Sequence, residues 1–172
     1  MPMYLYLGDI TRMETDAIVN AAGTDLRRCP GICDAIFAAA DTEKLERACR
    51  KLGRCRIGQA VATPSCGLPC RYIIHVAGPG WYGGEPRERF LLAGCYQNAL
   101  HKAYLCSCRR VAVPLIFSGD CHMPRAASLR VAGAAIADFC QRHPSMEVTL
   151  VLYRQSIYDM AKRILGWEDA PS

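Results

Sequence analysis

Segments with the pattern of strands and segments with the pattern of helices alternate along nearly the whole chain, and this alternation limits the fold more than any other feature. Short apolar runs predict strands, and longer stretches with apolar residues at helical spacing predict helices. The expected strands are 3–7, 17–20, 59–64, 71–78, 111–116 and 147–153, and the expected helices are 32–40, 42–52, 87–106, 125–140 and 156–165. Strands that are apolar throughout are typical of a sheet covered by helices on both faces. The pattern therefore predicts the α/β class, as a three-layer α/β/α sandwich.

The chain length sets the number of domains. With 172 residues, of which 51% are apolar, the chain is long enough for one sizeable core, and no linker or low-complexity run divides it. We therefore expect a single domain over residues 1–172. No apolar stretch approaches the roughly 20 residues that a membrane helix needs, and the first residues lack the basic region and apolar core of a secretion signal. A cytoplasmic location is the expectation.

The cysteines could indicate disulfides or a metal site. Their number is 11, which is odd, and many lie inside apolar segments, where a free thiol packs as a small hydrophobic side chain. The close spacings to weigh for a metal are Cys29-x3-Cys33, Cys66-x3-Cys70 and Cys106-x-Cys108. None fits the paired spacing of a structural zinc site well. We expect reduced thiols and no metal.

The formal net charge is +5, and the paired arginines are spread along the chain rather than massed in one run. A solvated surface is the simplest interpretation of such a distribution. The charge suits a phosphate-bearing ligand without requiring nucleic acid.

The loops after the strands are where a ligand is expected, because open α/β sheets bind ligands beyond the carboxyl ends of their strands. The segment after 17–20 contains Gly23, Pro30 and Gly31 before a helix begins, and the segment after 111–116 contains Gly119. Backbone N–H groups at such strand-to-helix turns favour an anion, although similar loops occur in proteins that bind nothing. Two of them in one domain suit a diphosphate. The G-x-G-x-x-G fingerprint is absent from the first turn, which argues against a nicotinamide-dependent dehydrogenase.

A set of motifs resembles one family over nearly the whole chain. These motifs are GDIT at 8–11, AIVNAAG at 17–23, PGICDAI at 30–36, YIIHVAGPGW at 72–81, VPLIFSG at 113–119 and VTLVLY at 148–153. In this order and spacing they resemble the macro domain family. The resemblance implies a mixed sheet between helices and a cleft that binds ADP-ribose, free or linked to a protein, with no cofactor. Some members only bind and others hydrolyse, and a module for another phosphate ligand, such as a nucleotide or an RNA end, stays open.

The resemblance also assigns the end of the cleft that holds the base. It implies that Asp9 accepts a hydrogen bond from the adenine amino group, with the backbone of Ile10 beside the ring. It places Tyr153 against the adenine face and Asn20 near the distal ribose. Each has a structural alternative: a turn or helix cap for Asp9, a core position for Tyr153, and a bond to the loop backbone for Asn20. The buried-strand position of His75 indicates a structural histidine rather than a base.

The phosphate loops carry the remaining assignments. By resemblance, the first loop consists of Gly31, Ile32 and Cys33, and the second consists of Ser118, Gly119, Asp120, Cys121 and His122. The second loop departs from the family, because Asp120 would repel a diphosphate unless only its N–H faces the ligand. His122 stands where the family usually has a glycine, which narrows the backbone geometry available there.

The first loop departs at the positions that matter for catalysis. Hydrolase members commonly have an asparagine at the position of Gly23 and an aspartate at that of Cys33. Asp34 is one residue away. A thiol at a helix N-terminus can be a nucleophile, but a packed Cys33 is the more economical interpretation. Removal of mono-ADP-ribose from proteins is therefore expected to be weak, and binding is the primary prediction.

Overall fold

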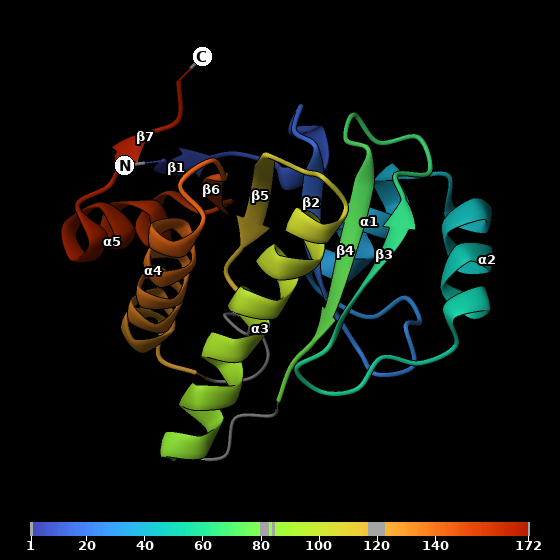
Figure 1. Ribbon diagram of the computed structural model, residues 1–172, viewed down its shortest axis with the longest axis horizontal. Helices are drawn as coiled ribbons and strands as arrows, with labels where there is room; N and C mark the ends of the chain where they lie inside the picture. Colours follow the sequence, from blue (N-terminus) through green and yellow to red (C-terminus); the bar gives the residue numbers. More distant parts are fainter. Residues whose placement is uncertain (1, 80–82, 84, 117–122, 172) are drawn as a thin grey trace.

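The computed structural model describes residues 2–79, 83, 85–116 and 123–171 and has three layers, with helices on both faces of one sheet (Figure 1). The elements in chain order are β1 (Met3–Leu7), the short 3-10 helix η1 (Ile10–Arg12), β2 (Ala17–Ala22), α1 (Ile32–Ala39), α2 (Thr42–Leu52), β3 (Ala60–Pro64), β4 (Tyr72–Ala77), α3 (Pro86–Leu105), β5 (Arg110–Pro114), α4 (Arg125–Arg142), β6 (Glu147–Leu152), α5 (Gln155–Leu165) and β7 (Glu168–Asp169). The predicted three-layer α/β/α sandwich is confirmed.

The sheet has seven strands in the order β3-β4-β2-β5-β6-β1-β7. Strand β3 runs antiparallel to β4, and the other pairings are parallel, so the sheet is mixed as the resemblance implied. Because the parallel strands share one direction, their carboxyl ends lie along one edge, toward which the arrows of β4 and β5 point downward in Figure 1. We call it the carboxyl edge.

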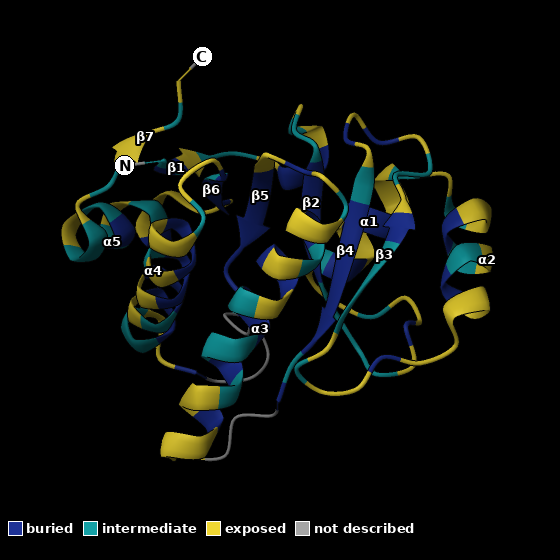
Figure 2. Cartoon of the chain, in the orientation of Figure 1, coloured by how far each residue is buried: buried dark blue, intermediate teal, exposed yellow. Residues whose placement is uncertain are grey.

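Alternating side chains of the central strands form two cores. Val19 and Ile74 pack with α3, α4 and α5, whereas Ile18 and Ile73 pack with α1 and α2 on the other face. Figure 2 shows the strands buried and the outer faces of the helices exposed. Two-sided burial explains why these strands are apolar throughout, since a residue on either face meets a helix.

Local signals fix where α2 begins and ends. Asp41 precedes its first residue, and Oδ1 of Asp41 accepts a hydrogen bond from the Lys44 N–H at 3.2 Å. Gly53 follows the last residue with a φ of 81°, a value that favours glycine. Asp41 lies next to Cys66, whose carbonyl accepts its N–H, just beyond the end of β3. Since β3 is antiparallel, α2 begins at the amino edge of the parallel strands and ends toward the carboxyl edge.

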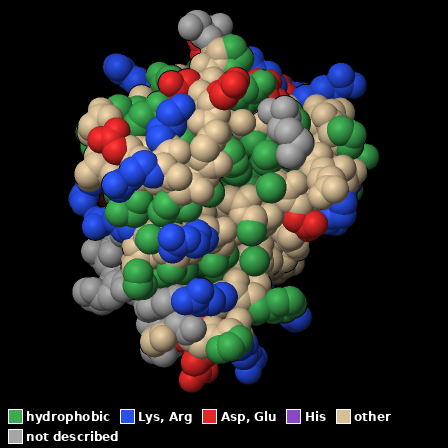
Figure 3. Space-filling view, turned by 90° about the vertical axis from the view of Figure 1, so that its left-hand side faces the viewer, with side chains coloured by type: hydrophobic (Ala, Val, Ile, Leu, Met, Phe, Trp, Pro, Cys, Tyr) green, Lys and Arg blue, Asp and Glu red, His purple; other side chains and the backbone are tan. Residues whose placement is uncertain are grey.

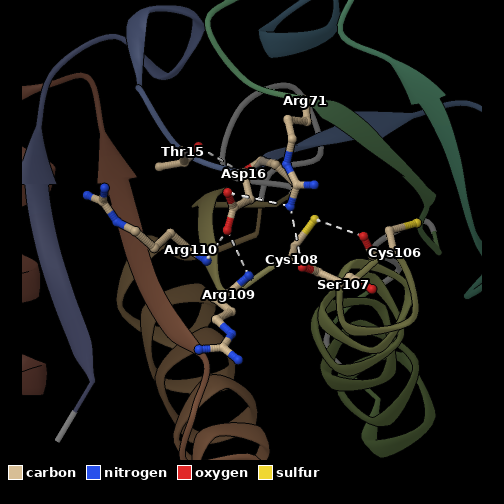
Figure 4. A network of polar contacts seen from close by, with 9 residues as sticks. Thr15, Asp16, Arg71, Cys106, Ser107, Cys108, Arg109 and Arg110 are labelled. Carbon is tan, nitrogen blue, oxygen red and sulfur yellow. Dashed lines mark hydrogen bonds and ion pairs between the residues drawn. The ribbon is translucent and has the colours of Figure 1, made fainter.

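A polar cluster holds the amino edge together (Figure 4). The carboxylate of Asp16 accepts the N–H groups of Arg109 at 2.8 Å and Arg110 at 2.9 Å, and it pairs with Arg71 at 3.6 Å. Partial burial raises the pKa of Asp16, but these N–H groups and the cations outweigh it, so the pKa lies below its ordinary value. The cluster joins the starts of β2, β4 and β5 and lies away from the carboxyl edge.

The predicted strands and helices agree with the observed elements to within two residues at each end. Two short elements, η1 and β7, were not predicted because a stretch of two or three residues carries no periodicity. None of the helices in the described ranges is long and apolar enough to cross a membrane. Within those ranges the cysteines are free thiols, and no group of three or more His, Cys, Asp or Glu side chains is arranged to hold a metal ion.

Candidate functional site

The carboxyl edge brings together segments that are far apart in the sequence. Strands β2, β5, β6 and β1 are neighbours in that order, so the loop after β2, the segment after β5, Tyr153 after β6 and Asp9 after β1 follow one another along the edge. The register aligns Leu7 with Leu152, and the Gly8 N–H donates to the Leu152 carbonyl at 2.9 Å. Asp9 and Tyr153 therefore leave the sheet side by side.

Asp9 has a structural role that leaves part of its carboxylate open. Its Oδ1 accepts the Thr11 N–H at 2.9 Å and the Thr11 hydroxyl at 2.7 Å, which caps η1. Among the described residues, Oδ2 takes no hydrogen bond, and the residue is exposed. Ile10 follows with a buried side chain at the first helical position, where a backbone N–H has no partner within the helix. Asp9 therefore caps η1, as one alternative predicted. Its Oδ2 remains as an acceptor for a ligand, and the Ile10 N–H remains as a donor.

Tyr153 is 81% exposed. The alternative of a core tyrosine is therefore wrong. An exposed ring beside Asp9 offers a flat apolar surface, and its contact with a base remains a prediction.

The loop between β2 and α1 is held in place by a buried leucine and by backbone hydrogen bonds. Leu26 has a φ of 59°, which is uncommon for a leucine, and its side chain is buried with 3% exposure. Its N–H donates to the Gly23 carbonyl at 3.1 Å, and the Thr24 carbonyl accepts the Cys55 N–H at 2.9 Å. Burial of the leucine side chain and these bonds stabilise the unfavourable backbone conformation. The loop consequently has a fixed path to α1.

Gly31 is the N-cap of α1 and has a φ of 91° and a ψ of −140°. It is exposed, and a Cβ added there would meet nothing within 4 Å, so open space lies beside the backbone. Its carbonyl accepts the Ala35 N–H, whereas the N–H groups of the first turn, including Ile32 and Cys33, have no partner within the helix. This helix start is suited to an anion.

A chain of buried polar side chains connects the first turn of α1 to strands β2, β4 and β3. The Asn20 amide nitrogen lies 3.7 Å from Sγ of Cys33 and 3.0 Å from Nδ1 of His75, and Nε2 of His75 lies 2.9 Å from the Thr63 hydroxyl. Burial lowers the pKa of His75 to about 4, so the imidazole is neutral. Its Nδ1 then accepts from Asn20, and its Nε2 donates to Thr63. This arrangement agrees with the structural role expected for His75.

Asn20 is fully buried, and its Oδ1 has no hydrogen-bond partner among the described residues. The predicted contact between Asn20 and a distal ribose remains a prediction. The contact of its amide nitrogen with Sγ of Cys33 indicates that Asn20 helps to position the first turn of α1.

The thiols of the first loop are poorly placed for nucleophilic attack. Cys33 is 1% exposed, and its S–H donates to the Arg27 carbonyl at 3.8 Å. Burial, followed by a hydrogen bond with Cys33, raises the pKa of Cys29 to about 12. Because the thiolate is the reactive form, these observations favour the packed role that was weighed for Cys33.

The carboxylates of the same loop are engaged with the chain itself. Oδ1 of Asp34 pairs with Nε of Arg28 at 2.6 Å, and Oδ1 of Asp25 accepts the Arg27 N–H at 3.1 Å. Asp34 is thus held toward Arg28 on the outer side of the loop. In this arrangement it does not replace the aspartate that the family's hydrolases commonly have at the position of Cys33.

The second predicted phosphate loop, Ser118, Gly119, Asp120, Cys121 and His122, lies outside the described residues. The structure does describe how the chain enters it. The Ile116 N–H donates to the Tyr96 hydroxyl at 2.8 Å, and the Ser128 hydroxyl donates to the Ile116 carbonyl at 3.3 Å. Sequence analysis missed Tyr96 and Ser128 because each lies within the apolar pattern of a helix and nothing marks its hydroxyl as bonded.

Fold and site together define an α/β/α domain with a helix start suited to an anion and an acidic cap on one sheet edge. The family model described as Macro domain matches residues 19–132. An Escherichia fergusonii protein described as an O-acetyl-ADP-ribose deacetylase is 38% identical over 168 residues, which cover 95% of this chain and 94% of that protein. The chain belongs to the macro domain family.

Solved structures agree with this assignment. The Oceanobacillus iheyensis macrodomain with ADP superimposes with a TM-score of 0.88 at 31% identity, covering 94% of this chain and 88% of that one. The Trypanosoma brucei macrodomain in complex with ADP-ribose gives a TM-score of 0.86 at 26% identity, covering 95% and 69%.

Proposed function

We propose that this chain binds ADP-ribose, free or linked to a protein, along the carboxyl edge. The adenine lies between Asp9 and Tyr153, and the diphosphate lies at the start of α1. The observation that carries the proposal is the open Oδ2 of Asp9 on the same edge as the open backbone at Gly31. The carboxyl ends of β1 and β2, from which these two features extend, are three strand spacings apart, roughly 14 Å at about 4.8 Å per strand, and an extended dinucleotide-like ligand can cover such a span.

The solved relatives support this ligand. The Trypanosoma brucei neighbour is described as a complex with ADP-ribose, and the Oceanobacillus iheyensis neighbour as a complex with ADP. Both superimpose over nearly the whole of this chain.

We further propose that the protein binds the ligand with slow or no hydrolysis. Cleavage of an ADP-ribosyl bond needs a positioned water and stabilisation of a positively charged transition state. Gly23 offers no side chain for the first task, Cys33 is buried, and Asp34 pairs with Arg28. The deacetylase description of the Escherichia fergusonii relative makes ester hydrolysis on ADP-ribose the reaction to assay. Any such reaction would depend on a ligand phosphate or backbone groups to hold the water.

A calorimetric titration with ADP-ribose, AMP and a short oligoadenylate tests the binding proposal. ADP-ribose makes contacts at both ends of the edge, so it should bind more tightly than AMP by at least about tenfold, or roughly 1.4 kcal/mol. Tighter binding of AMP or of the oligoadenylate would instead favour a module for another nucleotide or for an RNA end.

A further inference from the structure

A pocket of about 660 Å³ lies between the loop that joins β2 to α1 and the end of α2. Its lining includes the four arginines Arg27, Arg28, Arg50 and Arg54, together with Asp25 and Glu46. We call it the arginine pocket. The sequence separates the two arginine pairs by more than twenty positions, and the fold brings them to one hollow.

The lining carries four arginines against the two carboxylates of Asp25 and Glu46, so positive charge is in excess. Among the described residues, Arg28 forms an ion pair with Asp34, whereas Arg27, Arg50 and Arg54 form none. By contrast, on the side of the molecule that carries α5, Lys and Arg side chains are spread over the surface among hydrophobic, acidic and other groups (Figure 3). There, Lys162 of α5 pairs with Asp169. Convergent guanidinium groups in a hollow bind carboxylate or phosphate more strongly than isolated ones, because each offers a planar fork of donors.

The arginine pocket adjoins the proposed ligand site directly. The Arg27 carbonyl accepts the S–H of Cys33, and Arg28 pairs with Asp34, so both arginines contact the first turn of α1. The end of α2 and the loop between β2 and α1 both lie at the carboxyl edge, as Figure 1 shows. A molecule in the pocket would therefore lie next to a ligand at the start of α1.

The lining favours an acidic polypeptide over a nucleic acid. Asp25 and Glu46 would repel a continuous phosphate backbone but can be avoided by carboxylates on separate side chains. The aromatic residue of the lining, Phe37, is 1% exposed and offers no face on which a base could stack.

We propose that the arginine pocket docks an acidic segment of a polypeptide. Resting on the proposed function, this segment belongs to the protein that carries the ADP-ribosyl group. Arg50 binds its carboxylates from α2, Arg54 from the segment just after that helix, and Arg27 from the loop. The pocket thereby selects which modified proteins the domain reads, separately from its affinity for the nucleotide.

The test uses a fluorescein-labelled peptide that alternates Glu and Gly over ten residues, with binding followed by fluorescence anisotropy at low and moderate salt. The pocket variant carries Arg50→Glu and Arg54→Glu. The control carries Arg47→Glu and Lys51→Glu, which make the same charge change at exposed residues of α2 outside the lining. A second variant with Arg50→Gln and Arg54→Gln covers the case in which charge reversal disturbs folding, which circular dichroism would show.

The pocket variant should bind the peptide at least about tenfold more weakly than the parent, and the control should stay within about twofold. Equal weakening in both would overturn the proposal, because it would show a non-local charge effect. The proposal would also be overturned if the parent bound an oligouridylate of equal charge more tightly than the peptide and the pocket variant lost that binding. A parallel ADP-ribose titration separates the two proposals: peptide binding without ADP-ribose binding refutes the proposed function and leaves the arginine pocket standing.

Discussion

Asp9 combines a structural role with the proposed recognition of adenine, and substitutions can separate the two. Asp9→Ala removes both bonds to Thr11 and the open Oδ2. Asp9→Asn keeps one oxygen to cap η1 but replaces the other acceptor with an NH₂ group, which faces the adenine amino group as a second donor. Loss of a hydrogen bond to a charged group costs about 1.5 to 3 kcal/mol, or roughly 10- to 150-fold in affinity. Both variants should show this loss in a calorimetric titration with ADP-ribose.

Stability should respond differently. Loss of a cap costs about 0.5 to 2 kcal/mol, so Asp9→Ala should lower the free energy of unfolding in urea by that amount, while Asp9→Asn should change it by less. Asp41→Ala is the matched control, because it removes a capping bond to Lys44 at the amino edge. It should lower stability without changing the affinity for ADP-ribose. Parental affinity in Asp9→Asn, or an equal loss in Asp41→Ala, would refute the adenine assignment.

Three further predictions concern the loop and the buried histidine. Gly31→Glu places a bulky anion at a φ of 91° and should abolish ADP-ribose binding in calorimetry, whereas Gly166→Glu, at a φ of 66°, should not. Gly23→Asn with Cys33→Asp should speed single-turnover release of ADP-ribose from a modified carrier protein by roughly 10- to 10³-fold, and rapid release by the parent would contradict this reasoning. Because the pKa of His75 falls to about 4, only the unfolded state binds its proton near pH 5. The free energy of unfolding should therefore drop by up to about 2 kcal/mol from pH 7 to 5, and equal urea midpoints would contradict it.

The sequence predicted the layers and most elements because buried strands and amphipathic helices leave strong periodic signals. It could not predict contacts that depend on the register between strands. Asn20 meets His75 because β2 and β4 pair directly, and the two residues are opposite each other. The positive φ of Leu26 likewise depends on the burial of its side chain in a core built from several elements.

The arginines illustrate the same limit. Their spread along the sequence suggested a solvated surface, and only the path of the loop beside the end of α2 brings Arg27 and Arg50 to one pocket. The exposure of Tyr153 could not be predicted either, because an aromatic residue at the end of a buried strand fits the core equally well.

The crystal structure of the complex with ADP-ribose tests the central claim most directly. We predict the adenine amino group within hydrogen-bond distance of Oδ2 of Asp9, the ring against Tyr153, and a phosphate oxygen at the N–H groups of Ile32 and Cys33. A nucleotide that occupies the arginine pocket instead, or that lies along the carboxyl edge with its base away from Asp9, would contradict the claim.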